Sequence, residues 1–238
     1  MSVIDDIWGD FHKIAKDPSY SSGHTLKVVL PFFKAMRANS QWLYEFSKKS
    51  IRVVPNIASV LRNLDSKYNV RLISTSYRFF IRAVCDLIGF NFNKTFCTFI
   101  KRFDEIPISR IEAEILKAFM REVVNAPVIE YNLKTGEVIN EHQFLYLAFT
   151  TFVWEFVYNM PVGELIRKTH PMGQTQKHQA MLKVIERFKV PKGKVFYVGD
   201  SQTDVQCVQE LKGVGLTMMF NGKGKVCDDS DLMYIGED

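Results

Sequence analysis

The amino-acid sequence predicts a mixed α/β fold with parallel strands and additional helical elements. Two observations favour this fold. Val70–Ser74 and Thr95–Ile100 have the composition of strands and are separated by an amphipathic helical segment, which is the arrangement of a parallel strand–helix–strand unit. A second alternation begins near Thr175 and contains the apolar segment Lys194–Val198. With 238 residues, the chain is long enough for one large domain, or for a core with a smaller second domain.

The N-terminal quarter of the chain is predicted to be helical. Over residues 4–14, apolar side chains recur at intervals of three and four, as on one face of a helix. Two further helices are expected at about 25–36, with a kink at Pro31, and at 40–48. Pro55 opens a fourth helix, because proline is tolerated in a first helical turn.

A long interruption separates the two alternating regions. Ser109 and Glu112 have the spacing of a capping box, which predicts a helix reaching about residue 124. A hairpin is expected at about 127–139. The segment 144–158 is rich in aromatic residues and has two interpretations: a buried helix that contacts the core, or an aromatic pocket for a planar ligand. Aromatic residues on a helix usually belong to the core, which favours the first interpretation.

The last third of the chain returns to α/β order. A helix is expected at about 175–188. The strand Lys194–Val198 follows, and it is apolar on both faces, as is typical of a central parallel strand. Gly199 ends this strand, and further strands are expected at 214–220 and 232–235.

The composition excludes several classes of protein. Apolar residues make up 47% and charged residues 24%, which excludes a disordered or fibrous chain. The net charge is only +5 and the basic residues are scattered, so we expect no nucleic-acid partner. The sequence has neither a membrane-spanning apolar stretch nor a signal peptide, so we expect a cytoplasmic protein without a membrane partner. Its four cysteines and five histidines have neither zinc-ligand spacing nor the pattern of a Ser-His-Asp triad.

The strongest functional signal follows the strand Lys194–Val198. This strand ends in Gly199 and Asp200, and a second aspartate, Asp204, comes four residues later. Ligands of open parallel sheets bind beyond the carboxyl ends of the strands, which places Asp200 at the expected site. Two carboxylates there suit Mg²⁺. An alternative is that Asp204 is the N-terminal cap of the next helix. Capping explains one aspartate, but it does not explain both aspartates together with the glycine.

Two weaker signals lie elsewhere in the chain. The strand Val70–Ser74 leads through Thr75 into a helix, and a hydroxyl beside the free amides of a helix N-terminus forms a phosphate cradle. Serine and threonine are also common helix caps. Lys177 lies at the start of the helix that precedes the strand of Asp200. A lysine there opposes the helix dipole unless an anion is nearby.

Together these residues resemble the haloacid-dehalogenase-like (HAD-like) hydrolase superfamily. Its second, third and fourth motifs are matched, in order and spacing, by Ser74, Lys177, and Gly199-Asp200 with Asp204. The resemblance covers about residues 55–238. Three stretches are also similar to an uncharacterised, capped archaeal branch of HAD-like phosphatases: Thr25–Phe33, Ser74–Phe90 and Phe96–Thr98.

The resemblance implies a fold and a mechanism. The fold is a HAD-like Rossmannoid parallel sheet with helical cap elements. In the mechanism, an aspartate attacks the phosphorus of a small phosphate monoester and forms an aspartyl-phosphate, while Mg²⁺ offsets charge. The implied catalytic residues are Ser74, Lys177, Asp200 and Asp204. Asp200 would bind Mg²⁺ with support from Asp204, and the phosphoryl group would be bound by Ser74, Thr75 and Lys177.

The sequence departs from the superfamily at its first motif, an apolar strand that ends in Asp-x-Asp. No Asp-x-Asp precedes Ser74, and the acidic pair Asp5-Asp6 lies in a segment of helical periodicity. Residues 1–54 resemble instead the cap that follows the first strand, so the chain is expected to begin inside the cap. The predicted division is a helical cap remnant at 1–54, a core at 55–103 and 173–238, and a helical insert at 104–172.

The sequence thus predicts a Mg²⁺-dependent HAD-like phosphatase that is truncated or inactive. Two alternatives are a pseudoenzyme that keeps an anion and metal site for binding, and an active enzyme with another nucleophile. In the HAD-like fold, the first-motif strand lies between the strands that end at Ser74 and Gly199. Without it, both neighbouring strands would keep unpaired backbone groups, which cost about 1–3 kcal/mol each when buried, so we expect the gap to be filled. We expect Val70–Ser74 to pair directly with Val195–Val198. Met1–Ile7 or a strand from a second chain could fill the gap instead.

Overall fold

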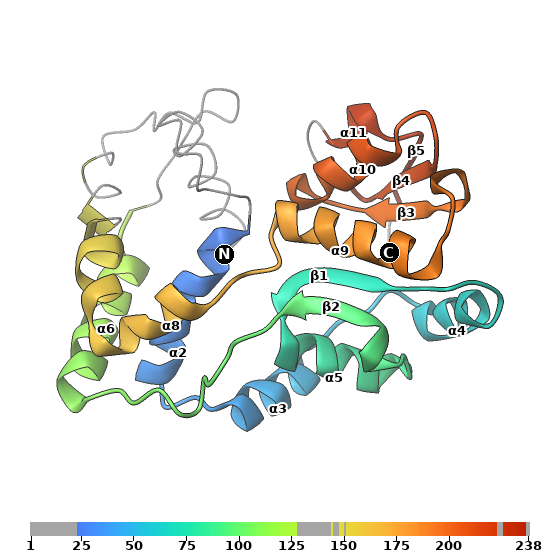
Figure 1. Ribbon diagram of the computed structural model, residues 1–238. Helices are drawn as coiled ribbons and strands as arrows, with labels where there is room; N and C mark the ends of the chain where they lie inside the picture. The colour runs from blue at the N-terminus through green and yellow to red at the C-terminus, as the bar shows by residue number, and fades with distance from the viewer. Residues whose placement is uncertain (1–22, 128–143, 145–147, 150, 223–225, 237–238) are drawn as a thin grey trace. The chain divides into compact units, whose positions relative to one another are not determined.

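The computed structural model describes residues 23–127, 144, 148–149, 151–222 and 226–236. The chain forms two compact units, each described here by itself (Figure 1). Unit 1 comprises Met1–Tyr20, His24–Phe46 and Phe99–His170, and unit 2 comprises Ser21–Gly23, Ser47–Thr98 and Pro171–Asp238. The sequence predicts a core at 55–103 and 173–238, and this division stays a prediction.

Unit 2 contains the five strands of the described residues, arranged in two parallel sheets. The first sheet pairs β1 (Leu72–Tyr77) with β2 (Thr95–Thr98). The second has the order β3 (Phe196–Gly199), β4 (Leu216–Phe220) and β5 (Leu232–Tyr234). Each of the five predicted strand segments is found as a strand. The prediction of a mixed α/β fold with parallel strands is therefore confirmed.

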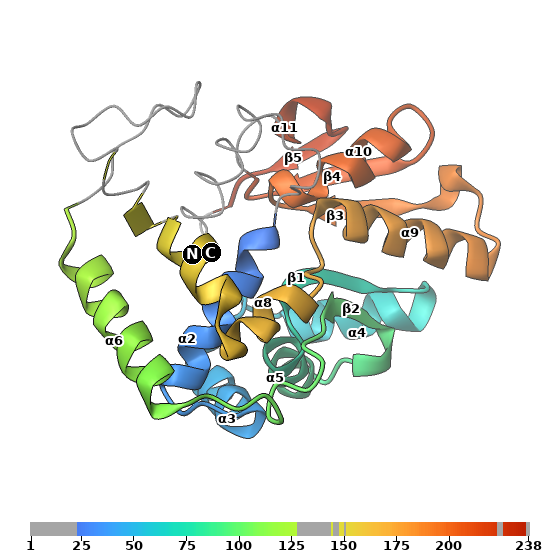
Figure 2. The ribbon, with the colours of Figure 1, turned by 60° about the vertical axis from the view of Figure 1, so that its left-hand side comes forward.

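The predicted pairing of Val70–Ser74 with Val195–Val198 is wrong. Within the described residues, β1 and β3 belong to separate sheets, and each has a partner strand on one side only (Figure 2). The substitute strand Met1–Ile7, with Asp5 and Asp6, lies outside the described residues. The gap between the two sheets is therefore not closed by the strands that the structure describes.

Gly23 lies close to both β1 and the turn after β3. A Cβ atom built on Gly23 would lie 3.6 Å from Cγ2 of Thr75, inside β1, and 3.8 Å from Cγ2 of Thr203, in the turn after β3. The same atom would lie 3.1 Å from the Cα of Gly173. Gly23 therefore lies beside both β1 and the turn after β3.

The expectation that β3 is covered on both faces is also wrong. Tyr197 is buried, but its neighbours Phe196 and Val198 are 54% and 47% exposed. The buried face of the sheet packs against α9 (Gln174–Phe188) and α10 (Val205–Leu211) through a cluster that includes Met181, Tyr197 and Leu211. Among the described residues, β3 is the end strand of its sheet, and its apolar side chains on the second face have no packed layer against them.

Side chains connect the two sheets of unit 2. Ile73, on β1, packs against the cluster between α9, α10 and the second sheet. A separate cluster on the first sheet contains Ile81, Cys85 and Ile88 from α5 (Arg78–Ile88), with Leu61 from α4 (Ile57–Lys67) packed against it. Gly89 ends α5 with a φ of 69°, as the sequence predicts. Unit 2 thus contains two hydrophobic cores, one for each sheet.

Short helical turns complete unit 2. They are η2 (Phe92–Lys94), η6 (Lys192–Lys194), η7 (Gln202–Asp204) and α11 (Val226–Asp229).

Unit 1 is helical in its described part. The expected helix at 25–36 is a 3₁₀ turn, η1 (His24–Val29), followed by α2 (Leu30–Ala35), because Pro31 takes a first-turn position. The remaining elements are α6 (Arg110–Asn125), η3 (Phe152–Phe156), η4 (Val157–Asn159), η5 (Pro161–Gly163) and α8 (Glu164–Lys168). α3 (Ser40–Ser50) crosses the boundary between the two units.

Two sequence predictions within unit 1 can be compared with the structure. Both hydrogen bonds of the capping box between Ser109 and Glu112 are present, at 3.1 and 2.8 Å. In the aromatic segment, Phe152 stacks on Phe119 of α6 with 4.2 Å between ring centroids. Phe144 and Phe156 of the same segment are exposed, so the described part of the segment is only partly packed. The hairpin expected at 127–139 lies, apart from Pro127, outside the described residues.

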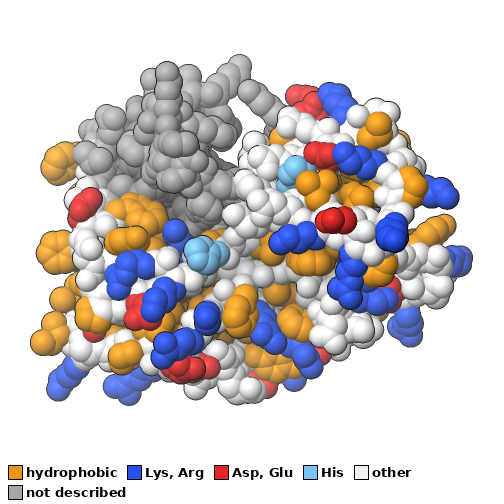
Figure 3. Space-filling model, viewed as in Figure 1, with side chains coloured by type: hydrophobic (Ala, Val, Ile, Leu, Met, Phe, Trp, Pro, Cys, Tyr) orange, Lys and Arg blue, Asp and Glu red, His pale blue; other side chains and the backbone are white. Residues whose placement is uncertain are grey.

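The surface carries mixed charge. On the face shown in Figure 3, Lys and Arg side chains alternate with Asp, Glu and exposed hydrophobic side chains. No helix in the described part of the chain has both the length and the apolar character needed to cross a membrane.

Thr98 joins the two halves of unit 2 and supplies the first test. Its fully buried hydroxyl donates to the carbonyl of Thr75 at 2.6 Å and accepts from the amide of Met172 at 2.9 Å. We expect Thr98→Val to lower the free energy of unfolding by about 1–3 kcal/mol, because both partners lose their hydrogen bond at almost constant side-chain volume. Urea denaturation measures the effect.

The matched control is Thr95→Val. Thr95 is half-buried, and its hydroxyl bonds to the local carbonyl of Phe92 and to the nearby Cys97 side chain. A loss in Thr98→Val no larger than in this control would show that the long-range bridge contributes nothing.

Candidate functional site

The turn after β3 is built around Gly199. A Cβ atom at this position would lie 2.7 Å from the Cβ of Asp204 and 2.8 Å from its Cγ, which is too close for any other residue. Glycine therefore lets the chain fold back so that the carboxylate of Asp204 lies beneath the turn. Asp200, the next residue, is exposed at the carboxyl end of the strand.

Asp204 accepts hydrogen bonds from five donors. Its Oδ1 accepts from Lys177 Nζ at 2.8 Å and from the Tyr197 hydroxyl at 2.7 Å. Its Oδ2 accepts from the amides of Asp200 and Ser201 and from the Ser201 hydroxyl, each at 3.2 Å. A carboxylate has about four acceptor positions, so Asp204 is fully used. Direct ligation of a cation by Asp204 would require one of these donors to leave.

The ion pair between Lys177 and Asp204 is almost completely buried. The side chains are 7% and 3% exposed, and Lys177 lies in the first turn of α9, as predicted. Burial opposes ionisation of Asp204, but the Lys177 ammonium and the hydrogen bonds together hold the pKa of the carboxyl below its ordinary value. The unfavourable position of a lysine at a helix N-terminus is therefore explained by an anion from the same protein.

Tyr197 and Cys207 extend this buried network, and the sequence analysis missed both. Burial and the charge of Asp204 raise the pKa of Tyr197, so its hydroxyl stays protonated and donates to the carboxylate. Burial also raises the pKa of Cys207 to about 11, which makes it an unreactive thiol. The available signal was a tyrosine inside an apolar strand, because a buried hydroxyl needs a partner.

The hydroxyl residues of β1 lie inside the strand and not directly before a helix. β1 runs to Tyr77, and α5 begins at Arg78, so the expected cradle of Ser74 with helix amides is not formed at this point. The register of β1 against β2 shifts between Ile73 and Tyr77, and the Ser74 hydroxyl accepts from the amide of Ser76 at 3.2 Å. Such irregularities turn side chains out of the regular alternation of a strand.

The structure brings together three of the four predicted catalytic residues. Lys177 contacts Asp204 directly, and Asp200 contacts the same carboxylate through its amide. Among the described hydrogen bonds and ion pairs, none joins Ser74 to these three. Gly23 lies between these regions, because a Cβ atom at this position would contact both Thr75 and Thr203. Its φ of 95° and close contacts mark it as a position for glycine, a signal that the sequence analysis did not use.

The described residues do not form a complete metal site. No group of three or more His, Cys, Asp or Glu side chains in this part of the chain is arranged to hold a metal ion. The oxygens of Asp204 already accept five hydrogen bonds, so Asp200 is the carboxylate of this turn that could ligate a metal ion. Mg²⁺ usually takes one or two protein carboxylates together with water and substrate phosphate, so one carboxylate alone is a minimal and weak site.

Comparison with known proteins gives a fold and no family. No family model and no curated protein matches the sequence. The structure is similar to that of gene product AF1437 from Archaeoglobus fulgidus, with a TM-score of 0.78 and 21% identity. The match covers 99% of this chain and 67% of that chain. At this identity, the similarity shows the fold alone.

A double-mutant cycle tests the buried ion pair. We expect Lys177→Met to lower the free energy of unfolding by about 3–5 kcal/mol, because it leaves a buried carboxylate without its counter-ion. Lys177→Met with Asp204→Asn removes both charges and should lose less than the sum of the two single variants, by about 1–3 kcal/mol. The exposed pair of Arg82 and Asp86 is the control, where Arg82→Met should cost less than about 1 kcal/mol. Additive losses at Lys177 and Asp204 would contradict a coupled pair.

Acid should weaken the fold through Asp204. Because the pKa of Asp204 is lower in the folded state than in the unfolded state, its contribution is complete above about pH 4 and is lost as the pH falls further. We expect the urea midpoint of the wild type to fall more steeply than that of Asp204→Asn between about pH 4 and pH 2. Parallel curves for the two proteins would count against this assignment.

Proposed function

We propose that the chain is a cytoplasmic, HAD-like relative of Mg²⁺-dependent phosphatases that binds a small phosphate monoester without hydrolysing it. The observation that carries this proposal is the Lys177–Asp204 ion pair beneath the Gly199 turn. It brings the residues that resemble the third and fourth motifs together at the carboxyl end of a parallel strand. The sequence matched these motifs by spacing alone, and the contact between them is an independent observation.

The open edges of β1 and β3 support the absence of hydrolysis. In the HAD-like superfamily, the strand with the nucleophilic aspartate lies between the strands of the second and fourth motifs. Among the described residues, β1 and β3 each lack a strand partner on one side, and no strand ending in aspartate lies between them. The site described here therefore has groups that could hold a phosphoryl group but no aspartate to attack it.

In the proposed site, the phosphoryl group and the metal ion would be bound by different residues. The hydroxyls of Ser74 and Thr75 would donate to phosphoryl oxygens, and Lys177 would supply positive charge while keeping its contact with Asp204. Asp200, exposed at the strand end, would be the protein carboxylate for Mg²⁺. Asp204 would act on the metal only indirectly, by holding the turn that presents Asp200.

A pseudoenzyme is the second candidate, in which binding itself is the function. The full use of Asp204 as an internal acceptor favours it, because this arrangement stabilises the turn without needing metal or substrate. In both candidates the anion site binds phosphate without releasing it. They differ in whether the site is the remnant of a phosphatase or a binding site that has its own function.

The experiment combines turnover and binding. A panel of phosphate monoesters is incubated with the protein, with Mg²⁺ and with EDTA, and binding of p-nitrophenyl phosphate is measured by calorimetry. We expect binding without phosphate release, weakened about tenfold by Ser74→Ala, because a hydrogen bond to a charged group contributes about 1.5–3 kcal/mol. Asp200→Ala should weaken binding only when Mg²⁺ is present. The control is Asp228→Ala, which removes an exposed carboxylate on α11.

Each contrary result has a clear meaning. Absence of binding by every monoester, or binding that Ser74→Ala leaves unchanged, would refute the proposed site. Mg²⁺-dependent phosphate release that Asp200→Ala abolishes would show that the chain has its own nucleophile and is an active phosphatase.

A further inference from the structure

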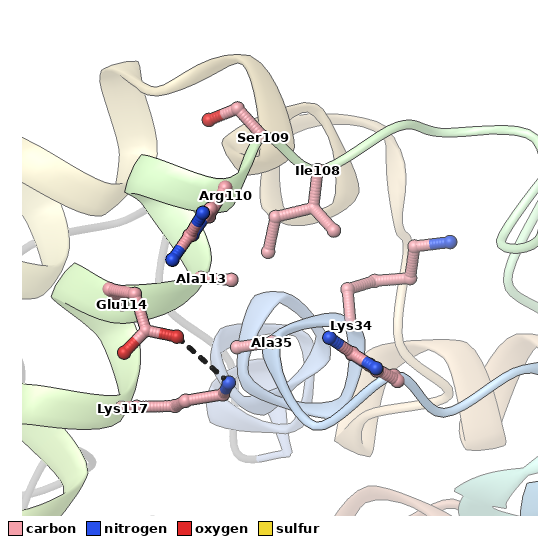
Figure 4. Close-up of a pocket in the computed structure, with 9 residues that line it drawn as sticks. Lys34, Ala35, Ile108, Ser109, Arg110, Ala113, Glu114 and Lys117 are labelled. Carbon is pink, nitrogen blue, oxygen red and sulfur yellow. Dashed lines mark hydrogen bonds and ion pairs between the residues drawn. The ribbon is translucent and has the colours of Figure 1, made fainter.

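A pocket between two helices of unit 1 has no role in the function proposed above. It lies between α2 and the N-terminal half of α6, which pack against each other, and has a volume of about 570 Å³ (Figure 4). The small side chains of Ala35 and Ala113 line it and leave this space open. The volume is within the range of about 300–1,000 Å³ that is usual for small-molecule sites.

The lining is strongly positive. Lys34, Arg37, Arg110 and Lys117 contribute four cations, and Glu114 contributes the one carboxylate. In Figure 4, Arg110, Glu114 and Lys117 line the pocket from α6, whereas Lys34 belongs to the α2 side. Four cations beside one carboxylate give a local surplus of three, compared with +5 for the whole chain of 238 residues.

Internal partners neutralise only part of this charge. Lys117 bonds to Glu114 at 3.1 Å, which accounts for the single carboxylate. The Lys34 ammonium lies 5.3 Å from the centroid of the buried Phe103 ring, a contact that holds the cation without cancelling its charge. Among the described residues, no ion pair is formed by Arg37 or Arg110. The pocket therefore keeps three cations that are not balanced by a carboxylate.

The backbone places two of these cations at unfavourable positions. Arg37 follows α2 with a φ of 61°, a left-handed conformation that glycine adopts with least strain. Arg110 is the first residue of α6, where a positive charge opposes the helix dipole. Arg110 is unfavourable for the dipole of α6, and Arg37 has a strained backbone although its charge suits the C-terminal end of α2. Both residues line the pocket, and an anion there would offset the charge of Arg110.

We propose that this pocket binds a small oxyanion with two or more negative charges, either a phosphorylated compound or a polycarboxylate. Arg37 and Arg110 would donate to its oxygens from the two helices, and Lys34 would add charge. Guanidinium groups suit both ligand types, because their paired N–H donors match the spacing of carboxylate and phosphate oxygens. The proposal does not depend on the phosphoryl site of unit 2.

Calorimetry with the full chain at low ionic strength tests the proposal, with pyrophosphate and citrate as probes and acetate as the singly charged comparison. We expect at least one of the two multivalent probes to bind and acetate not to bind. Arg110→Gln and Arg37→Gly should each weaken the affinity about tenfold. Arg37→Gly has a further use, because glycine fits the left-handed backbone and the melting temperature should stay constant or rise. Lost binding would then not reflect unfolding.

Arg121→Gln is the matched control, since it removes an exposed arginine from the same helix outside the pocket. It should change the affinity less than twofold. The relative affinities of pyrophosphate and citrate identify which of the two ligand chemistries the pocket prefers. Failure of both probes to bind, unchanged affinity in Arg37→Gly and Arg110→Gln, or an equal loss in Arg121→Gln would each overturn the proposal.

Discussion

The buried ion pair of Lys177 and Asp204 is the constraint around which unit 2 is organised. A carboxylate on a side chain that is 3% exposed must be compensated, and here the compensation comes from a helix, a strand and a turn at once. These donors fix the first turn of α9 relative to the end of β3. They also require glycine at position 199, because a side chain there would occupy the space of the carboxylate. The exposed position of Asp200 follows from this arrangement.

The geometry separates residues that hold the site from residues that could react. Asp204 and Tyr197 are saturated by contacts inside the protein, whereas Asp200 remains exposed. A motif match cannot make this distinction, because it reads two aspartates four residues apart as one metal site. The structure assigns them opposite surroundings, and this difference is why we place binding before catalysis in the proposed function.

The sequence predicted what depends on local pattern. The five strands, the capping box at Ser109 and the end of α5 at Gly89 follow from hydrophobic periodicity and from backbone preferences of single residues. The contact of Lys177 with Asp204 was predicted only through a family resemblance. The wrong predictions concern contacts between segments that are far apart in the sequence. The strands β1 and β3 belong to separate sheets. Which strands pair depends on contacts between distant segments of the chain, and no pattern within either strand reveals it.

The separation of the two sheets has a consequence for how unit 2 opens. In the described part of the chain, each sheet has its own backbone hydrogen-bond ladder and its own hydrophobic core, and the connections between them include Ile73, the bridging hydroxyl of Thr98, and Arg71, which lies over the ring of Phe188 of α9. Amide protons of the two sheets therefore need not exchange with solvent in one cooperative event. The β3–β4–β5 half, which also contains the buried ion pair, can stay closed while β1 and β2 open. The hydroxyl residues of β1 would then be exposed to solvent more often than Asp200 and Asp204 in the turn after β3.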